Sequence, residues 1–222
     1  MATEVTDIVS HEFFHTITPL NIHSEKIHFF NYNTPAFSEH LWFYEGVTEY
    51  FTNHFQVSQK LISPGDYFDR IKRQLNVSGK FNDSLSFTEL SAHILEEPYS
   101  TNFINLYFKG PLIAMCIDIL IREESNGTRN MLSLTKELSE KYGKDNYFKD
   151  DQFIREVTAM TYPSVGDFLN THVSGGQPID YRFYLNKAGL EIEKKGAEII
   201  RLVKSKKATA KQLALLDNWL TK

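Results

Sequence analysis

The sequence of 222 residues contains a single cysteine, Cys116, so no disulfide can form within the chain. It has no long run of one charge, since 24 Lys and Arg stand against 28 Asp and Glu for a net charge of -4. We therefore expect no cationic surface for nucleic acid. The longest apolar stretch, residues 111–121, is too short to span a bilayer and contains Asp118, so we expect no membrane span.

Apolar residues make up 41% of the chain and aromatic residues 14%, which is enough for a buried core and excludes a disordered chain. Residues 1–7 lack the basic end and apolar stretch of a signal peptide. A dense functional motif follows within the first helix predicted. We therefore interpret the chain as a piece of a longer protein whose N-terminal part is missing, and the compartment of that parent, including export, stays open.

The spacing of apolar residues predicts a mainly helical fold. The predicted helices are 3–17, 39–55, 64–76, 86–96, 112–122, 128–141, 150–160, 164–172 and 180–187. Residues 21–37 are predicted to form a long ordered loop, within which 26–30 is a candidate strand. A second candidate strand is 190–192. The tail, residues 194–222, alternates Lys-rich and Leu-rich stretches and is predicted to form two more helices.

The sharpest motif is His11-Glu12-Phe13-Phe14-His15, an H-E-x-x-H pattern. Residues four apart lie on one face of a helix, so His11 and His15 can direct both imidazoles at one metal ion. Glu12 would then lie beside the metal and could take a proton from metal-bound water. The same pattern arises by chance in about one chain in a hundred, in which case these are ordinary helix residues.

A third metal ligand is expected from a later helix, because a catalytic zinc ion has three protein ligands and one water. Glu45 is the candidate, since it directly follows three aromatic residues, where a buried carboxylate needs a cation beside it. A surface position is the ordinary alternative for a glutamate. Glu49, four residues later on the same face, could accept the second imidazole N–H of His11 or His15, or else be a solvated acid.

Three blocks of sequence carry a family resemblance. They are residues 9–16 (VSHEFFHT), 41–46 (LWFYEG) and 106–110 (LYFKG). In this order they resemble the glycyl aminopeptidase family of gluzincin metallopeptidases. The 29 residues from Thr16 to Tyr44 are similar to the longer spacing of that family, whereas the alanyl aminopeptidase and leukotriene hydrolase group has a shorter one.

The resemblance implies a mainly helical fold. Residues 1–190 would be a metallopeptidase catalytic domain, the helical lobe of a thermolysin-like gluzincin, truncated at its N-terminal side. Residues 191–222 would be a C-terminal helical extension. Family members carry an N-terminal β-rich domain and a strand that lines the substrate cleft, and we find neither here. Phe108 also departs from the family, which usually has an acid at this point of the third block.

The resemblance also implies a set of site residues. His11, His15 and Glu45 would bind one Zn2+ per chain. Glu12 would be the general base and then the proton shuttle to the leaving amine. Tyr107 would donate a hydrogen bond to the oxyanion of the tetrahedral intermediate, although a tyrosine next to an apolar helix is more often a core residue.

The implied function is a zinc-dependent peptidase, an aminopeptidase that releases small N-terminal residues such as Gly or Ala by means of activated water. The expected partner is a peptide substrate, with neither nucleic acid nor membrane, and the oligomeric state stays open. One alternative is a non-catalytic helical fragment or degenerate relative that keeps the fold, with or without zinc. Another is an epoxide or ester hydrolase on the same scaffold, which the longer spacing disfavours.

The remaining candidates have simpler interpretations. His23, His28, His40 and His54 are expected to be loop or surface residues. Cys116 lies in the apolar helix and is expected to be a buried small hydrophobic residue, not a nucleophile.

Overall fold

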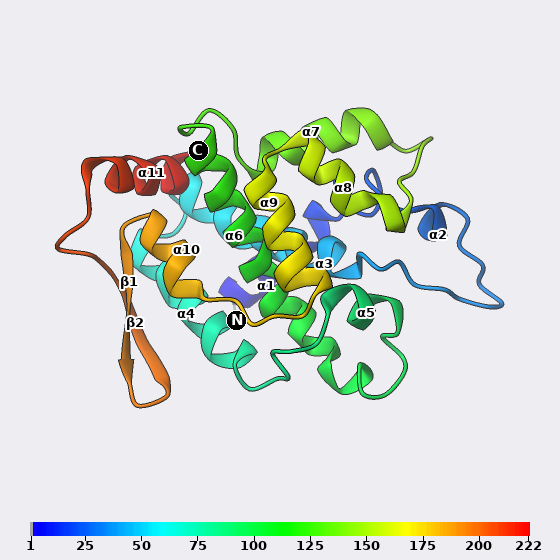
Figure 1. Ribbon diagram of the computed structural model, residues 1–222, viewed down its shortest axis with the longest axis horizontal. Helices are drawn as coiled ribbons and strands as arrows, with labels where there is room; N and C mark the ends of the chain where they lie inside the picture. The colour runs from blue at the N-terminus through cyan, green and yellow to red at the C-terminus, as the bar shows by residue number, and fades with distance from the viewer. Residues whose placement is uncertain (1) are drawn as a thin grey trace.

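Apolar residues recur at helical spacing along most of this sequence. The computed structural model describes residues 2–222, and over this range it is mostly helical, with one two-stranded sheet (Figure 1). The elements are α1 (Ala2–Phe14), α2 (Glu25–His28), α3 (Leu41–Ser58), α4 (Pro64–Ser78), α5 (Phe87–Ala92), the 3₁₀ helix η1 (Ser100–Tyr107), α6 (Lys109–Glu124), α7 (Met131–Tyr142), α8 (Asp150–Met160), α9 (Pro163–Phe168), the π-helical turn η2 (Leu169–Ser174), α10 (Tyr181–Lys187), β1 (Leu190–Lys195), β2 (Glu198–Lys204) and α11 (Ala210–Thr221). The prediction of a mainly helical fold is confirmed.

The core is built around α6, which is buried along most of its length and packs against α3. Cys116 is buried in α6, as predicted. The two helices cross at Gly46 and Gly110, where a Cβ added to Gly46 would lie 2.7 Å from the backbone of Gly110. A larger residue at either position would push the helices apart. This close crossing brings Glu45 beside Tyr107, which ends η1 just before α6 begins.

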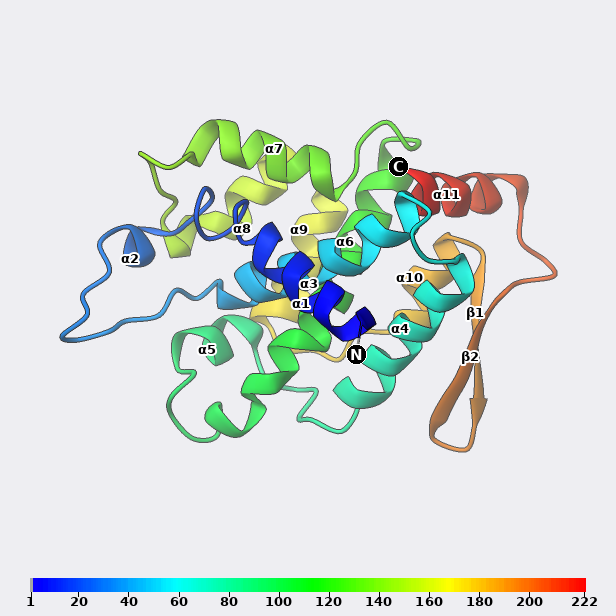
Figure 2. The ribbon, with the colours of Figure 1, turned by 180° about the vertical axis from the view of Figure 1, so that it is seen from behind.

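The first helix lies on the outside of α3, as Figure 2 shows from behind. No described side chain of α1 from Val5 onward is fully buried. Its apolar contact with α3 is made by Phe14, whose ring lies 5.6 Å from Phe51 and 5.8 Å from Phe55 between centroids. Four apolar side chains of α1 are exposed: Val5, Ile8, Val9 and Phe13. Little buried apolar surface therefore holds this helix in place.

The last helix, α11, is joined to α3 and α6 by a buried polar network. Asp118 pairs with Arg122 at 2.8 Å and accepts a hydrogen bond from the Tyr50 hydroxyl at 2.6 Å. Arg122 donates to the carbonyl of Asn218, and the indole of Trp219 donates to the Tyr50 hydroxyl. Burial by itself raises the pKa of Asp118, but the charges of Arg122 and His54 and the hydrogen bonds from Tyr50 and Arg122 together outweigh burial, and the pKa falls below its usual value. The carboxylate therefore stays charged.

Two predictions of local structure are wrong. Residues 26–30, expected as a strand, overlap α2, because the side chain of Ser24 caps a helical turn by accepting from the backbone of Ile27. The tail has one helix in place of two, since an antiparallel hairpin of β1 and β2 precedes α11. Gly196 makes the hairpin turn with φ of 63°, which glycine adopts readily. The expected strand at 190–192 is confirmed as part of β1.

His23 and His40 lie in loops, as predicted, but their side chains are buried, whereas His54, predicted to be a loop or surface residue, is buried in α3. Each has a backbone partner that satisfies a ring nitrogen, as buried polar groups require. The ring of His40 donates to the carbonyl of Asp150 at 2.9 Å, and that of His54 to the carbonyl of Trp219 at 2.6 Å. The three histidines therefore have a structural role, because each ring forms a hydrogen bond with the backbone of another segment or turn.

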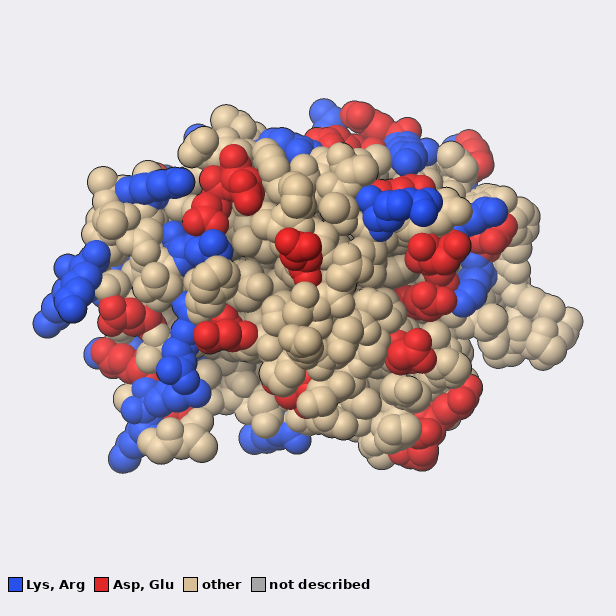
Figure 3. Space-filling model, viewed as in Figure 1, with Lys and Arg blue, Asp and Glu red and all other residues tan. Residues whose placement is uncertain are grey.

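None of the helices in the described range is by itself long and apolar enough to cross a bilayer. The bent pair of η1 and α6 reaches that length and hydropathy only when the two are taken together, and α6 is the buried core helix. Figure 3 shows acidic and basic side chains interspersed on one face of the molecule, with Lys and Arg densest near the hairpin.

Candidate metal centre

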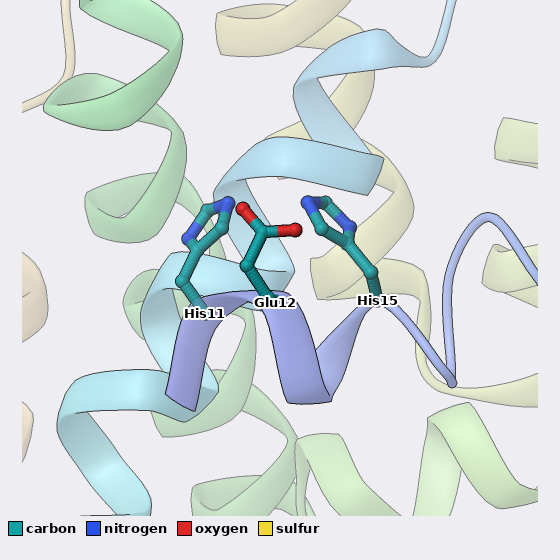
Figure 4. Close-up of side chains that lie close together, drawn as sticks. All are labelled: His11, Glu12 and His15. Carbon is teal, nitrogen blue, oxygen red and sulfur yellow. The ribbon is translucent and has the colours of Figure 1, made fainter. Parts of the chain in front are cut away.

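The H-E-x-x-H motif lies at the end of α1. His11 and Glu12 belong to its last turn, and His15 follows the helix by one residue. The backbone N–H of His15 donates to the carbonyl of His11 at 3.3 Å, so helical spacing is kept across the motif. The three side chains point to the same side of the helix (Figure 4), and one ligand atom from each lies within 4.8 Å of the others. The motif thus gathers its polar atoms at one point.

Glu45 meets the two histidines from α3. Its Oε2 lies 3.3 Å from Nε2 of His11 and 3.8 Å from Nε2 of His15. A tetrahedral zinc ion with ligand bonds of about 2.0–2.2 Å needs donor atoms roughly 3.3–3.5 Å apart. The chemistry of these two imidazoles and one carboxylate fits zinc; the distance from Glu45 to His11 matches this spacing, and the distance to His15 is slightly longer. Glu12 is the more exposed acid, beside these donors.

Each imidazole is oriented through its other ring nitrogen. Nδ1 of His11 donates to Oε2 of Glu49 at 3.1 Å, and Nδ1 of His15 donates to the carbonyl of Thr18 at 3.0 Å. These bonds leave both Nε2 atoms facing Glu45, as in metal sites where outer partners fix the tautomer. The sequence left open which histidine Glu49 would reach, and here it is His11. A backbone partner such as Thr18 leaves no signal in the sequence.

His11 carries the strongest electrostatic perturbation of the site. Burial by itself lowers the pKa of its imidazole, but hydrogen bonds and charge from Glu45 and Glu49 outweigh burial and raise the pKa to about 9. Imidazole binds a metal only in its neutral form, so a metal ion and a proton compete for this ring.

Tyr107 faces the same point from η1. Its ring centroid lies 5.9 Å from that of His11. Burial, the charge of Glu45 and hydrogen bonding to Glu45 raise the pKa of the Tyr107 phenol well above its usual value. The phenol therefore keeps its proton at neutral pH and is available as a hydrogen-bond donor.

A hollow of about 510 Å³ opens at this point of the surface. It is lined by Asp7, Ile8, His11, Glu12, His15, Glu45, Glu49 and Tyr107. Four of these are carboxylic acids, and none of the described residues around the hollow is Lys or Arg. The site therefore attracts cations, whether a metal ion or a positively charged group of a ligand.

Three polar residues were not predicted from the sequence: Asp7, which lines the hollow, and Asn53 and Arg70, which lie behind it. Asn53 donates to Oε1 of Glu49 at 2.8 Å, and Arg70 bonds both Asn53 and Asp7. Helical spacing was an available signal for two of them, because Asp7 precedes His11 by four residues and Asn53 follows Glu49 by four. Nothing in the sequence pointed to Arg70.

Comparisons with known proteins show a family and a fold to which the chain is similar. Residues 4–113 match the family model of the M61 glycyl aminopeptidases. Among solved structures, the chain is similar to an aminopeptidase N family protein from Idiomarina loihiensis, with a TM-score of 0.75 and 24% identity. The match covers 86% of this chain and 34% of that one, so this chain spans about a third of its length. At this identity the likeness shows the fold. A comparison with curated proteins gave no match.

Proposed function

The chain belongs to the M61 glycyl aminopeptidase family, and on that premise we propose that it is a zinc-dependent aminopeptidase that releases small N-terminal residues such as Gly or Ala. The observation that carries the proposal is the convergence of three donors from His11, His15 and Glu45. They meet in a hollow that Glu12 and Tyr107 also line. The donor set supports zinc in particular, because two imidazoles and one carboxylate leave one position open.

The side chains divide the chemistry between them. His11, His15 and Glu45 would hold zinc, which when bound lowers the pKa of a water ligand to about 7 and polarises the scissile carbonyl. Glu12 accepts the proton of the attacking water and delivers it to the leaving amine. Tyr107 donates its phenolic hydrogen to the carbonyl oxygen as negative charge develops there.

The charge of the hollow supports release of residues from the N-terminus of a peptide. Its lining contains four carboxylic acids and, among the described residues, no Lys or Arg. Asp7 is paired with Arg70, and bound zinc would offset the charge of Glu45. Glu12 and Glu49 would therefore be the acids left to attract the ammonium group of a free N-terminus. The preference for small residues is supported by the family alone.

The proposal is tested with p-nitroanilides of Gly, Ala and Leu, and with N-acetyl-Ala-p-nitroanilide. We expect the zinc-loaded chain to cleave the Gly and Ala substrates fastest, to cleave the acetylated one poorly, and to stop when a chelator removes zinc. Equal rates with and without the acetyl group would contradict an aminopeptidase. Bound zinc without turnover would favour the non-catalytic alternative, and cleavage of amino-acid esters without any cleavage of the anilides would favour an ester hydrolase.

A further inference from the structure

A chain of hydrogen bonds leads from the metal centre to α4. Nδ1 of His11 donates to one oxygen of Glu49 at 3.1 Å, and the amide of Asn53 donates to the other at 2.8 Å. Arg70 in turn donates to the side-chain oxygen of Asn53 at 2.8 Å. Both oxygens of Glu49 are thus engaged, and the orientation of its carboxylate depends on Asn53 and, through it, on Arg70.

This series of hydrogen bonds continues from Arg70 back to α1, the helix that carries His11. Arg70 pairs with Oδ1 of Asp7 at 3.1 Å, and Gln56 donates to the same oxygen at 2.9 Å. Asp7 lies one helical turn before His11 in α1. Arg70 therefore closes a ring of polar contacts that passes through α1, α3 and α4. We call His11, Glu49, Asn53, Arg70 and Asp7 the clamp.

The packing explains why a clamp is needed. α1 carries His11 and Glu12, yet its side chains from Val5 onward are exposed or only partly buried. Without a large apolar contact, its position on α3 depends on Phe14 and on polar contacts. Arg70 is well placed for this task, because only 19% of its side chain is exposed and its ion pair with Asp7 is partly shielded from water.

We propose that Arg70 is a positioning residue of the metal centre, which holds Glu49 against His11 through Asn53 and fixes α1 on α3 through Asp7. The inference rests on the proposed function, since it concerns the same metal ligands. Arg70 does not line the hollow and would act only through these neighbours.

The first test is the zinc affinity of the full chain, measured by competition with a chromophoric chelator. Arg70→Met is expected to weaken zinc binding by about tenfold or more, the scale found for outer partners of metal ligands. Arg70→Lys should recover part of this loss because it keeps a donor and the charge. The matched control is Arg73→Met, at an exposed arginine of the same helix, which should bind zinc as the wild type does. An Arg70→Met affinity equal to that control would overturn the inference.

A double-mutant cycle distinguishes the positioning of Glu49 by Arg70 from a general contribution of Arg70 to the stability of the fold. In a Glu49→Gln background, Arg70→Met should weaken zinc binding clearly less than it does in the wild type, because only the contact through Asp7 is left to lose. The same loss in both backgrounds would mean that Arg70 does not act through Glu49. Asn53→Ala interrupts the same route from α3 and should weaken zinc binding even if Arg70→Met fails to fold. Wild-type affinity in Asn53→Ala would contradict the clamp.

A readout without metal distinguishes this inference from the proposed function. In the zinc-free protein, Arg70→Met should speed amide hydrogen exchange in α1 and leave exchange in α6 unchanged. If the wild type bound no zinc, the proposed function would fail, but exchange would still decide whether Arg70 holds α1. Unchanged exchange in α1 would overturn the clamp, whatever the zinc result.

Discussion

Glu12→Gln is expected to abolish hydrolysis and to leave zinc bound. Glutamine has nearly the same shape as glutamate but cannot accept the proton of the attacking water, and loss of a general base lowers kcat by about 10²–10⁴-fold. Zinc should stay, because its three ligands, His11, His15 and Glu45, are untouched. The fold should be unaffected, because Glu12 is exposed. Turnover of Ala-p-nitroanilide and zinc content measured on the same preparation check both halves.

The control for this substitution is Glu198→Gln, which makes the same chemical change at an exposed position of β2. It should turn over as the wild type does. Unchanged turnover in Glu12→Gln would remove Glu12 from the mechanism. Loss of zinc in that variant would instead make Glu12 a metal ligand, in the place that we give to Glu45.

Tyr107→Phe is expected to lower kcat by about 10²–10³-fold with little change in KM, since it removes one donor to the developing oxyanion. The pKa of the phenol lies well above its usual value, so the hydroxyl carries its proton over the whole neutral range. A donor used mainly in the transition state affects kcat and kcat/KM alike. The steady-state parameters for Ala-p-nitroanilide give both values.

Tyr99→Phe is the matched control, because Tyr99 directly precedes η1 and Tyr107 ends it. Its kinetic constants should equal those of the wild type. A Tyr107→Phe variant with a raised KM and an unchanged kcat would assign Tyr107 to substrate binding, against the role proposed here.

The parts of the site that lie close together in sequence could be predicted. Helical periodicity alone places His11 and His15 on one face, with Glu12 beside them, and the structure brings their polar atoms together. Glu45 was a candidate because it follows three aromatic residues, and the resemblance to a family supported Glu45 and supplied Tyr107. Their approach to His11 depends on the crossing of α3 and α6, which no local pattern specifies.

Contacts between distant segments could not be predicted. Arg70 reaches Asp7 and Asn53 only because α4 folds back beside α1 and α3, so the clamp has no counterpart in a single-helix pattern. The hairpin was missed for a related reason. Its second strand is fixed by pairing with β1 and by Asn76, which exchanges two hydrogen bonds with the backbone of Ile199. The strand pairing and the hydrogen bonds of Asn76 therefore outweigh the helical propensity of this Lys-rich segment.

The most direct test of the central claim is the zinc content of the purified chain, measured by elemental analysis after zinc loading and desalting. His11→Ala is the control, because it removes one imidazole and keeps the rest of the donor set. We expect about one zinc per chain in the wild type and a loss of zinc in His11→Ala. A folded wild-type chain that retains no zinc, or a His11→Ala variant that retains as much as the wild type, would contradict a metal centre formed by His11, His15 and Glu45.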